Sequence, residues 1–115
     1  NPVYLDGDKT IELPEKVKIV TTETIYTIRK EITPDLKIEK VILFGSRAKG
    51  TNDPGSDIDI AIRGPLLTLD DTLESLAEIE RLSLPYRIDL VIFDRIREPA
   101  LISHIERVGI CLFER

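Results

Sequence analysis

The sequence predicts one α+β domain, with an α/β-like order of elements, in which helices cover a small mixed β-sheet mainly on one face. The 115 residues allow a single compact domain and leave little length for a second. Short apolar runs, typical of buried strands, alternate along the chain with stretches of helical periodicity. Residues 1–13 are expected to form an N-terminal hairpin extension and residues 14–115 the main domain.

A hairpin and a long helix are expected first. Asp6-Gly7 is a typical two-residue hairpin turn, because both turn positions need a positive φ angle. Pro14 suits the first turn of a helix, and apolar residues over 17–32 recur on approximately one helical face. This helix is expected to end before Pro34.

Two strands of the main sheet are expected next. Residues 40–44 (KVILF) form an apolar run that stops at a glycine, which predicts a buried strand. Residues 45–50 (GSRAKG) are expected to turn the chain or to begin a short helix, and residues 51–55 to form a loop. Residues 57–62 (DIDIAI) alternate between polar and apolar side chains, as expected of a strand with two different faces.

A helix over residues 70–82 is expected to follow, with Thr68 as its N-cap. Its inward face is predicted from the apolar residues near helical spacing, which are Leu69, Leu73, Leu76 and Ala77. The same helix is strongly acidic, with Asp70, Asp71, Glu74, Glu78 and Glu80. A solvated surface is the simpler interpretation of these charges, and contact with a basic partner is the alternative.

The chain is expected to end with a strand, a helix and a short strand. Residues 87–93 (RIDLVIF) predict the strand, and Pro99 suits the start of the helix. Gly109 is expected to end this helix before a terminal strand over residues 110–113. His104, within the helix, is expected to be a surface or boundary residue.

Composition argues against several classes of protein. The net charge is −5, whereas proteins that bind long DNA or RNA neutralise phosphates with a basic surface, so no direct binding to long nucleic acid is expected. One histidine and one cysteine are too few for a zinc site or a histidine-dependent triad. Cys111 is expected to be a small core residue. Without a leader pattern or an 18-residue apolar run, a cytoplasmic protein without membrane contact is expected.

Three aspartates in two strands are candidates for chemistry. Asp57 and Asp59 are two residues apart on a predicted strand, so their carboxylates project from the same face. Asp89 interrupts an otherwise apolar strand, where aspartate is uncommon. At a separation of about 5 Å and an effective dielectric near 20, two such charges repel by roughly 3 kcal/mol, so a compensating cation is expected. Hard carboxylate oxygens favour Mg²⁺ or Mn²⁺, while carboxylates that point into water are the alternative.

A glycine-serine pair directly follows the predicted strand over residues 40–44. Gly45 allows the backbone to approach a ligand closely, and the Ser46 hydroxyl with the following amides can hold phosphate oxygens. Arg47 and Lys49 are candidates for neutralising phosphate charge, or are solvated charges of a turn. A glycine-serine pair alone is a common turn, so the combination with the aspartates is what indicates a site.

The segments 45–50 (GSRAKG) and 56–62 (SDIDIAI) together resemble the signature of the nucleotidyltransferase superfamily that includes DNA polymerase β. More narrowly, the chain resembles the minimal nucleotidyltransferases of the MntA-like group, whose small fold residues 15–113 fit. A polymerase β-like nucleotidyltransferase fold is therefore implied. The resemblance also places a third aspartate one helix later, where Asp89 lies.

The resemblance implies a set of roles for these residues. Asp57 and Asp59 would bind two Mg²⁺ ions, and Asp89 would complete the site of the ion that activates the acceptor hydroxyl. Gly45 and Ser46 would hold the β- and γ-phosphates of a nucleoside triphosphate, with ATP as the expected substrate.

The same resemblance implies a partner. In the minimal family the acceptor is a tyrosine of a HEPN-domain toxin, which is neutralised when it receives AMP, so this chain would be an antitoxin. Two alternatives stay open: a small hydroxylated acceptor such as an aminoglycoside, and an inactive module that neutralises its partner by contact. The complete set of motif residues favours an active enzyme, and a homo- or hetero-oligomer is compatible with each reading.

Overall fold

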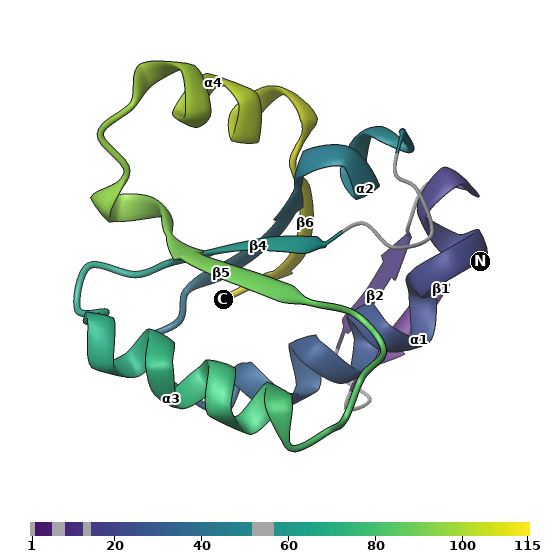
Figure 1. The fold of residues 1–115 in the computed structure, drawn as a ribbon, viewed down its shortest axis with the longest axis horizontal. Coiled ribbons are helices and arrows are strands. Elements are labelled where there is room, and N and C mark those ends of the chain that lie inside the picture. The colour runs from purple at the N-terminus through teal and green to yellow at the C-terminus, as the bar shows by residue number, and fades with distance from the viewer. Residues whose placement is uncertain (1, 6–8, 13–14, 52–56) are drawn as a thin grey trace.

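The computed structural model describes residues 2–5, 9–12, 15–51 and 57–115, with side chains described from Thr24 onward. In chain order, the elements are β1 (Pro2–Leu5), β2 (Lys9–Glu12), α1 (Glu15–Ile32), β3 (Lys40–Phe44), α2 (Gly45–Lys49), β4 (Ile58–Arg63), α3 (Leu69–Glu80), β5 (Ile88–Ile92), a 3₁₀ turn (Phe93–Arg95), α4 (Pro99–Val108) and β6 (Ile110–Glu114). Figure 1 shows the main sheet in the middle of the molecule, between helices above and below it. No described helix has the length and apolar character needed to cross a membrane.

The N-terminal elements agree with the prediction as far as they are described. β1 and β2 pair antiparallel in a separate two-stranded sheet, with Leu5 opposite Lys9. The predicted turn at Asp6-Gly7 lies outside the described residues. The long helix is confirmed and ends at Ile32, two residues before Pro34. The division of the chain into an extension and a main domain stays a prediction.

The main sheet is mixed, with the strand order β5-β4-β3-β6. β3 is antiparallel to both of its neighbours, whereas β4 and β5 are parallel and joined by a crossover through α3. The register places Phe44 opposite Asp59, and Asp59 opposite Asp89. The end of β3 and the starts of β4 and β5 therefore meet at one end of the sheet.

The two faces of the sheet are packed differently. α1 and α3 cover one face, and α4 covers part of the other (Figure 1). The core on the α1 and α3 side includes Ile25, Ile28, Ile58, Ile60, Ile62 and Ile79. The smaller core on the α4 side consists of Ile42, Phe44, Ala61 and Ile105. Because successive side chains of a strand point to opposite faces, Asp59 lies on the α4 side.

The predicted inward face of α3 is wrong. Leu69 and Leu73 are 63% and 55% exposed, and Ala77 is exposed as well. Only Leu76, of the four predicted residues, packs against the core. The buried residues of this helix are instead Asp71, Thr72, Ser75 and Ile79.

Polar contacts at the start of α3 explain its orientation. Thr68 caps the helix as predicted, and its side chain forms a reciprocal capping box with Asp71. Lys37, in the loop before β3, donates a hydrogen bond of 2.6 Å to the Asp71 carboxylate. These bonds turn Asp71 inward. The small side chains of Thr72 and Ser75 then follow it to the buried side of the helix.

Two details near the C-terminus complete the fold. Cys111, predicted to lie in the core, is exposed because the alternation of edge strand β6 buries its neighbour Leu112 instead. Arg115 fastens the loop between α1 and β3, since its guanidinium donates hydrogen bonds of 2.7 Å to the carbonyl oxygens of Thr33 and Ile38.

Candidate active site

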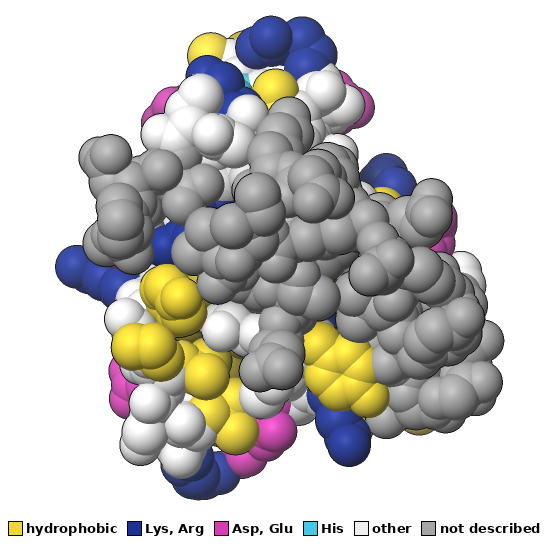
Figure 2. Space-filling view, turned by 90° about the vertical axis from the view of Figure 1, so that its right-hand side faces the viewer, with side chains coloured by type: hydrophobic (Ala, Val, Ile, Leu, Met, Phe, Trp, Pro, Cys, Tyr) yellow, Lys and Arg dark blue, Asp and Glu magenta, His cyan; other side chains and the backbone are white. Residues whose placement is uncertain are grey.

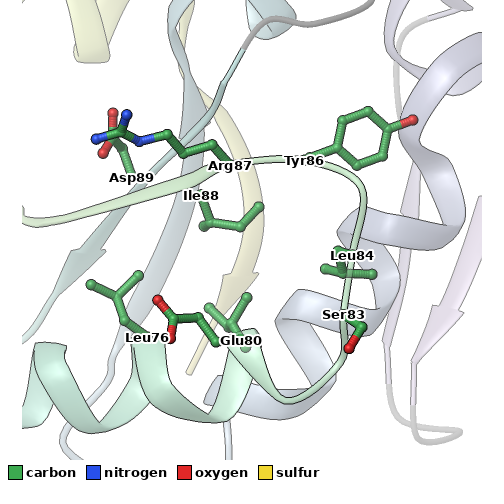
Figure 3. A pocket seen from close by; sticks show the side chains of 9 residues that line it. Leu76, Glu80, Ser83, Leu84, Tyr86, Arg87, Ile88 and Asp89 are labelled. Atoms are coloured by element: carbon green, nitrogen blue, oxygen red, sulfur yellow. The ribbon is translucent and has the colours of Figure 1, made fainter.

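Two of the predicted aspartates lie side by side on the face of the sheet that α4 covers. Asp59 in β4 is directly opposite Asp89 in the parallel strand β5, so both side chains leave the same face. Figure 3 shows Asp89 on one side of β5 and Ile88 on the other, toward α3. The position of these two residues on one face agrees with the prediction, while their role as metal ligands stays a prediction.

Asp57 immediately precedes β4, which begins one residue later than predicted, and its side chain is half-buried. Burial raises the pKa of Asp59 above its ordinary value of 3.8, and the negative charges of Asp89 and Asp57 raise it further. A positive charge on His104 would oppose this shift of the Asp59 pKa. Asp57 and Asp89 are therefore close enough for their negative charges to affect the ionisation of Asp59.

The carboxylates of this site are the ligands that a hard divalent cation prefers. In the part of the chain that the structure describes, no three carboxylate, imidazole or thiol groups form a ready metal site. The pair Asp59 and Asp89 nevertheless supplies hard oxygen ligands on one face, and Asp59 ionises less readily than an isolated carboxyl group. A bound cation would favour the ionised form and offset the repulsion between the two carboxylates.

Gly45 brings the backbone against the Asp59 carboxylate. Its φ angle is +77°, a conformation that residues with a side chain rarely adopt. A Cβ atom at this position would overlap the Asp59 side chain. The geometry therefore requires glycine where β3 passes into α2, and α2 begins directly beside the carboxylate.

The other residues of α2 lie in different environments. Ser46, in the first turn, is half-buried, whereas Lys49 is exposed. Arg47 is only 2% exposed, and its guanidinium lies 4.8 Å from the ring centroid of Tyr86. A solvated turn charge is thus wrong for Arg47, which packs inside the protein. Its role at phosphates stays a prediction, as do the roles of Ser46 and Lys49.

Sequence reasoning missed His104 as a residue of this site. Its Nε2 atom accepts a hydrogen bond of 3.2 Å from the backbone N–H of Gly45. Its ring also meets Phe44 edge to face, with ring centroids 6.2 Å apart. In the sequence, His104 is recognisable only as the residue before the apolar Ile105 on a predicted helix. That position does not indicate that its side chain contacts the end of β3.

A cavity of about 400 Å³ lies between β5 and α3, and Arg87 and Asp89 are among the residues that line it. Its lining includes Leu76 from α3, Leu84 and Tyr86 from the following loop, and Ile88 (Figure 3). Figure 2 shows apolar side chains gathered in the lower part of the face that looks out to the right of Figure 1. The cavity lies toward α3, and it borders the candidate site because Asp89 is one of its lining residues.

The comparison with protein families agrees with this fold. Residues 23–115 match the family described as "Polymerase beta, Nucleotidyltransferase". The chain therefore belongs to the polymerase β-type nucleotidyltransferase family, and it is a nucleotidyltransferase. The mixed sheet with its flanking helices is the fold of that family.

Individual relatives narrow the resemblance to small members of the family. The chain is 32% identical over 93 residues to "Putative protein adenylyltransferase MJ0141" of Methanocaldococcus jannaschii, covering 76% of this chain and 94% of that protein. A chain in the crystal structure of a toxin–antitoxin with AMP-PNP superposes with a TM-score of 0.67 at 26% identity, covering 83% of this chain and 75% of the other. The structure of a tri-AMPylated Shewanella oneidensis HEPN toxin in complex with MNT antitoxin gives a TM-score of 0.55 at 22% identity, covering 81% and 69%. This last likeness shows the fold alone.

Proposed function

We propose that this chain transfers AMP from ATP to a tyrosine hydroxyl of a HEPN-type partner and acts as the antitoxin of that pair. The observation that carries the proposal is the pairing of Asp59 and Asp89 on one face of the sheet, beside the glycine that begins α2. The choice of AMP and of a protein acceptor is supported by likeness to a chain named an adenylyltransferase and to one from a toxin–antitoxin structure with AMP-PNP.

Asp57, Asp59 and Asp89 are the residues proposed to hold two Mg²⁺ ions, for which Mn²⁺ would substitute. Bound ions would supply charge neutralisation at the triphosphate and activation of the acceptor hydroxyl. The protein holds Asp59 against the α2 backbone, which restricts the directions its carboxylate can take. Asp89 lies in edge strand β5, where it can complete the ligand set next to an acceptor arriving from outside.

The start of α2 is proposed to receive the triphosphate. Gly45 leaves room that any other residue would fill, and the Ser46 hydroxyl lies in the first turn of the helix. Lys49 is exposed and free to extend toward phosphate oxygens, while the buried Arg47 fixes α2 against Tyr86. These residues would orient the nucleotide so that its α-phosphate faces Asp59 and Asp89.

The proposed reaction is an in-line displacement at the α-phosphorus of ATP. A bond forms between the acceptor oxygen and the α-phosphorus, and the bond from that phosphorus to the bridging oxygen of the β-phosphate breaks. Pyrophosphate leaves, and the hydroxyl proton passes to solvent. The product is an adenylated tyrosine on the partner.

The test is a transfer assay with α-labelled ATP, Mg²⁺ and a HEPN-type protein that co-purifies with this chain. Label and one added adenylate mass are expected on the partner, and tandem mass spectrometry should place them on a tyrosine. The double variant Asp57→Asn/Asp59→Asn is expected to lose the transfer. Glu106→Gln, a matched carboxylate-to-amide change at an exposed position of α4, is expected to retain it.

The same assay separates the alternatives. Label that persists in the double aspartate variant would refute the assignment of the metal ligands. Adenylation of an aminoglycoside but not of the protein would move the acceptor to the small-molecule class. A partner that is inhibited by complex formation without any label would show a binding module.

A further inference from the structure

The imidazole of His104 joins α4 to the first residue of α2. The first N–H groups of a helix have no acceptor within the helix, and the N-cap residue Phe44 supplies no side-chain hydrogen bond here. His104 provides the missing acceptor for the Gly45 N–H from a position 59 residues further along the chain. A tertiary contact therefore replaces the local cap of α2.

The hydrogen bond defines the chemical form of this histidine. A backbone N–H can donate only to a nitrogen with a free lone pair, so this contact requires an unprotonated Nε2, with the proton of the neutral ring on Nδ1. The edge contact with Phe44 fixes the plane of the ring from the strand side. The two contacts hold the imidazole against both residues at the junction of β3 and α2.

This junction determines where α2 lies relative to the carboxylate. Gly45 has no side chain that could set its position, and its backbone is in contact range of Asp59. The Gly45 N–H is also occupied by His104, so it is not available to a phosphate, which leaves the Ser46 hydroxyl and the later amides for that task.

We propose that His104 is a positioning residue for nucleotidyl transfer: its neutral Nε2 holds the Gly45–Ser46 backbone at a fixed place beside Asp59. The inference rests on the proposed function, because it assigns the role of one more residue in the same site. It makes α4 a support of the catalytic face rather than only a cover of the smaller core.

Three variants separate the acceptor from the ring. His104→Phe keeps an aromatic ring against Phe44 and removes the acceptor. His104→Gln loses the ring and returns an acceptor, because its amide oxygen reaches about as far as Nε2. Glu106→Gln, two residues further on the same helix and exposed, is the control.

The kinetic expectation is a loss in catalysis that the glutamine variant reverses. For His104→Phe, kcat/KM with Mg·ATP should fall about tenfold or more, since small displacements of positioning groups have large effects on rate. His104→Gln should recover most of this loss, and Glu106→Gln should match the wild type. Unchanged kcat/KM in His104→Phe, or an equal loss in a folded His104→Gln, would overturn the proposal.

Nuclear magnetic resonance tests the contact without any activity. In the wild type, the ¹⁵N shifts of His104 should show an unprotonated Nε2, and the Gly45 amide should exchange slowly with solvent. The amide should exchange fast in His104→Phe and slowly again in His104→Gln. A protonated Nε2 in the wild type would refute the contact even if the phenylalanine variant failed to fold. Slow exchange in a wild type that transfers no AMP would instead refute the proposed function and leave the contact standing.

Discussion

Gly45 occupies a position where a methyl group would have no space. The left-handed backbone conformation alone costs a residue with a side chain about 1–2 kcal/mol, and the added Cβ would also meet the Asp59 carboxylate. Gly45→Ala is therefore expected to lower the free energy of unfolding by at least about 1 kcal/mol and to abolish AMP transfer. Urea unfolding monitored by circular dichroism gives the first quantity, and a variant as stable as the wild type would contradict the geometry.

The raised pKa of Asp59 has a consequence for stability at different pH values. Because the folded protein disfavours the charged form, the Asp59 charge destabilises the fold once the pH exceeds the raised pKa, and this penalty disappears as the pH falls to the ordinary value of 3.8. Without divalent cations, Asp59→Asn is expected to be as stable as the wild type or more stable at pH 7. Thermal melts in chelator measure the difference, and a clear loss of Tm in the variant would exclude strain from like charges at this site.

Not every residue of the site was accessible to prediction. The alternation over residues 57–62 is a local pattern, so the face of Asp59 could be read from adjacent side chains. The role of His104 depends on a contact with Gly45 that spans 59 residues, and the burial of Arg47 depends on Tyr86 from a distant loop. Neither contact leaves a periodic signal in the sequence.

At the scale of elements, α3 shows how a local polar contact can override an apolar pattern. Leucine spacing predicted one face, but the capping box and the bond from Lys37 direct Asp71 inward. The Lys37 hydrogen bond, followed by the backbone hydrogen bond of Thr68, lowers the pKa of Asp71. The consequence is that Leu69 and Leu73 lie on the exposed side of the helix, among its acidic residues.

The exposed acidic side of α3 is the candidate contact for a basic partner. Glu74→Lys/Glu78→Lys should weaken the complex with a HEPN-type partner by roughly tenfold at low ionic strength, because two attractive charges become repulsive. Glu98→Lys/Glu106→Lys, at two exposed positions at and in α4, is the control because it changes the net charge by the same amount. Titration calorimetry or surface plasmon resonance measures the affinity, and an equal Kd for both variants would place the partner elsewhere.

At the scale of the whole molecule, the candidate site needs three strands, because β3, β4 and β5 meet at one end of the sheet. Nucleotide binding there should therefore depend on the folded protein. A ligand that binds only the folded state stabilises it, by about 2.7 kcal/mol at a concentration one hundred times its Kd. Mg·ATP is therefore expected to raise the Tm of the wild type and to leave Asp57→Asn/Asp59→Asn unchanged. Differential scanning fluorimetry with ATP, Mg²⁺ or both gives the comparison, and an equal rise in the double variant would remove these carboxylates from the binding site.

The overall architecture was largely predictable because each strand is bounded by a local signal. The apolar runs over residues 40–44 and 87–93 predicted two strands, and the structure forms them at 40–44 and 88–92. The alternation over residues 57–62 predicted the third strand, which the structure forms at 58–63. The strand order was not contained in those signals. It depends on the crossover through α3, which places β5 next to β4.

Arg115 connects two regions that the chain keeps far apart. Its guanidinium ties down the loop from Thr33 to Ile38, and Lys37 of the same loop grips Asp71 at the beginning of α3. Through this one loop, the residue that follows β6 is linked to the capping turn of α3. Arg115→Ala should therefore loosen this loop and weaken the Lys37 contact that holds Asp71.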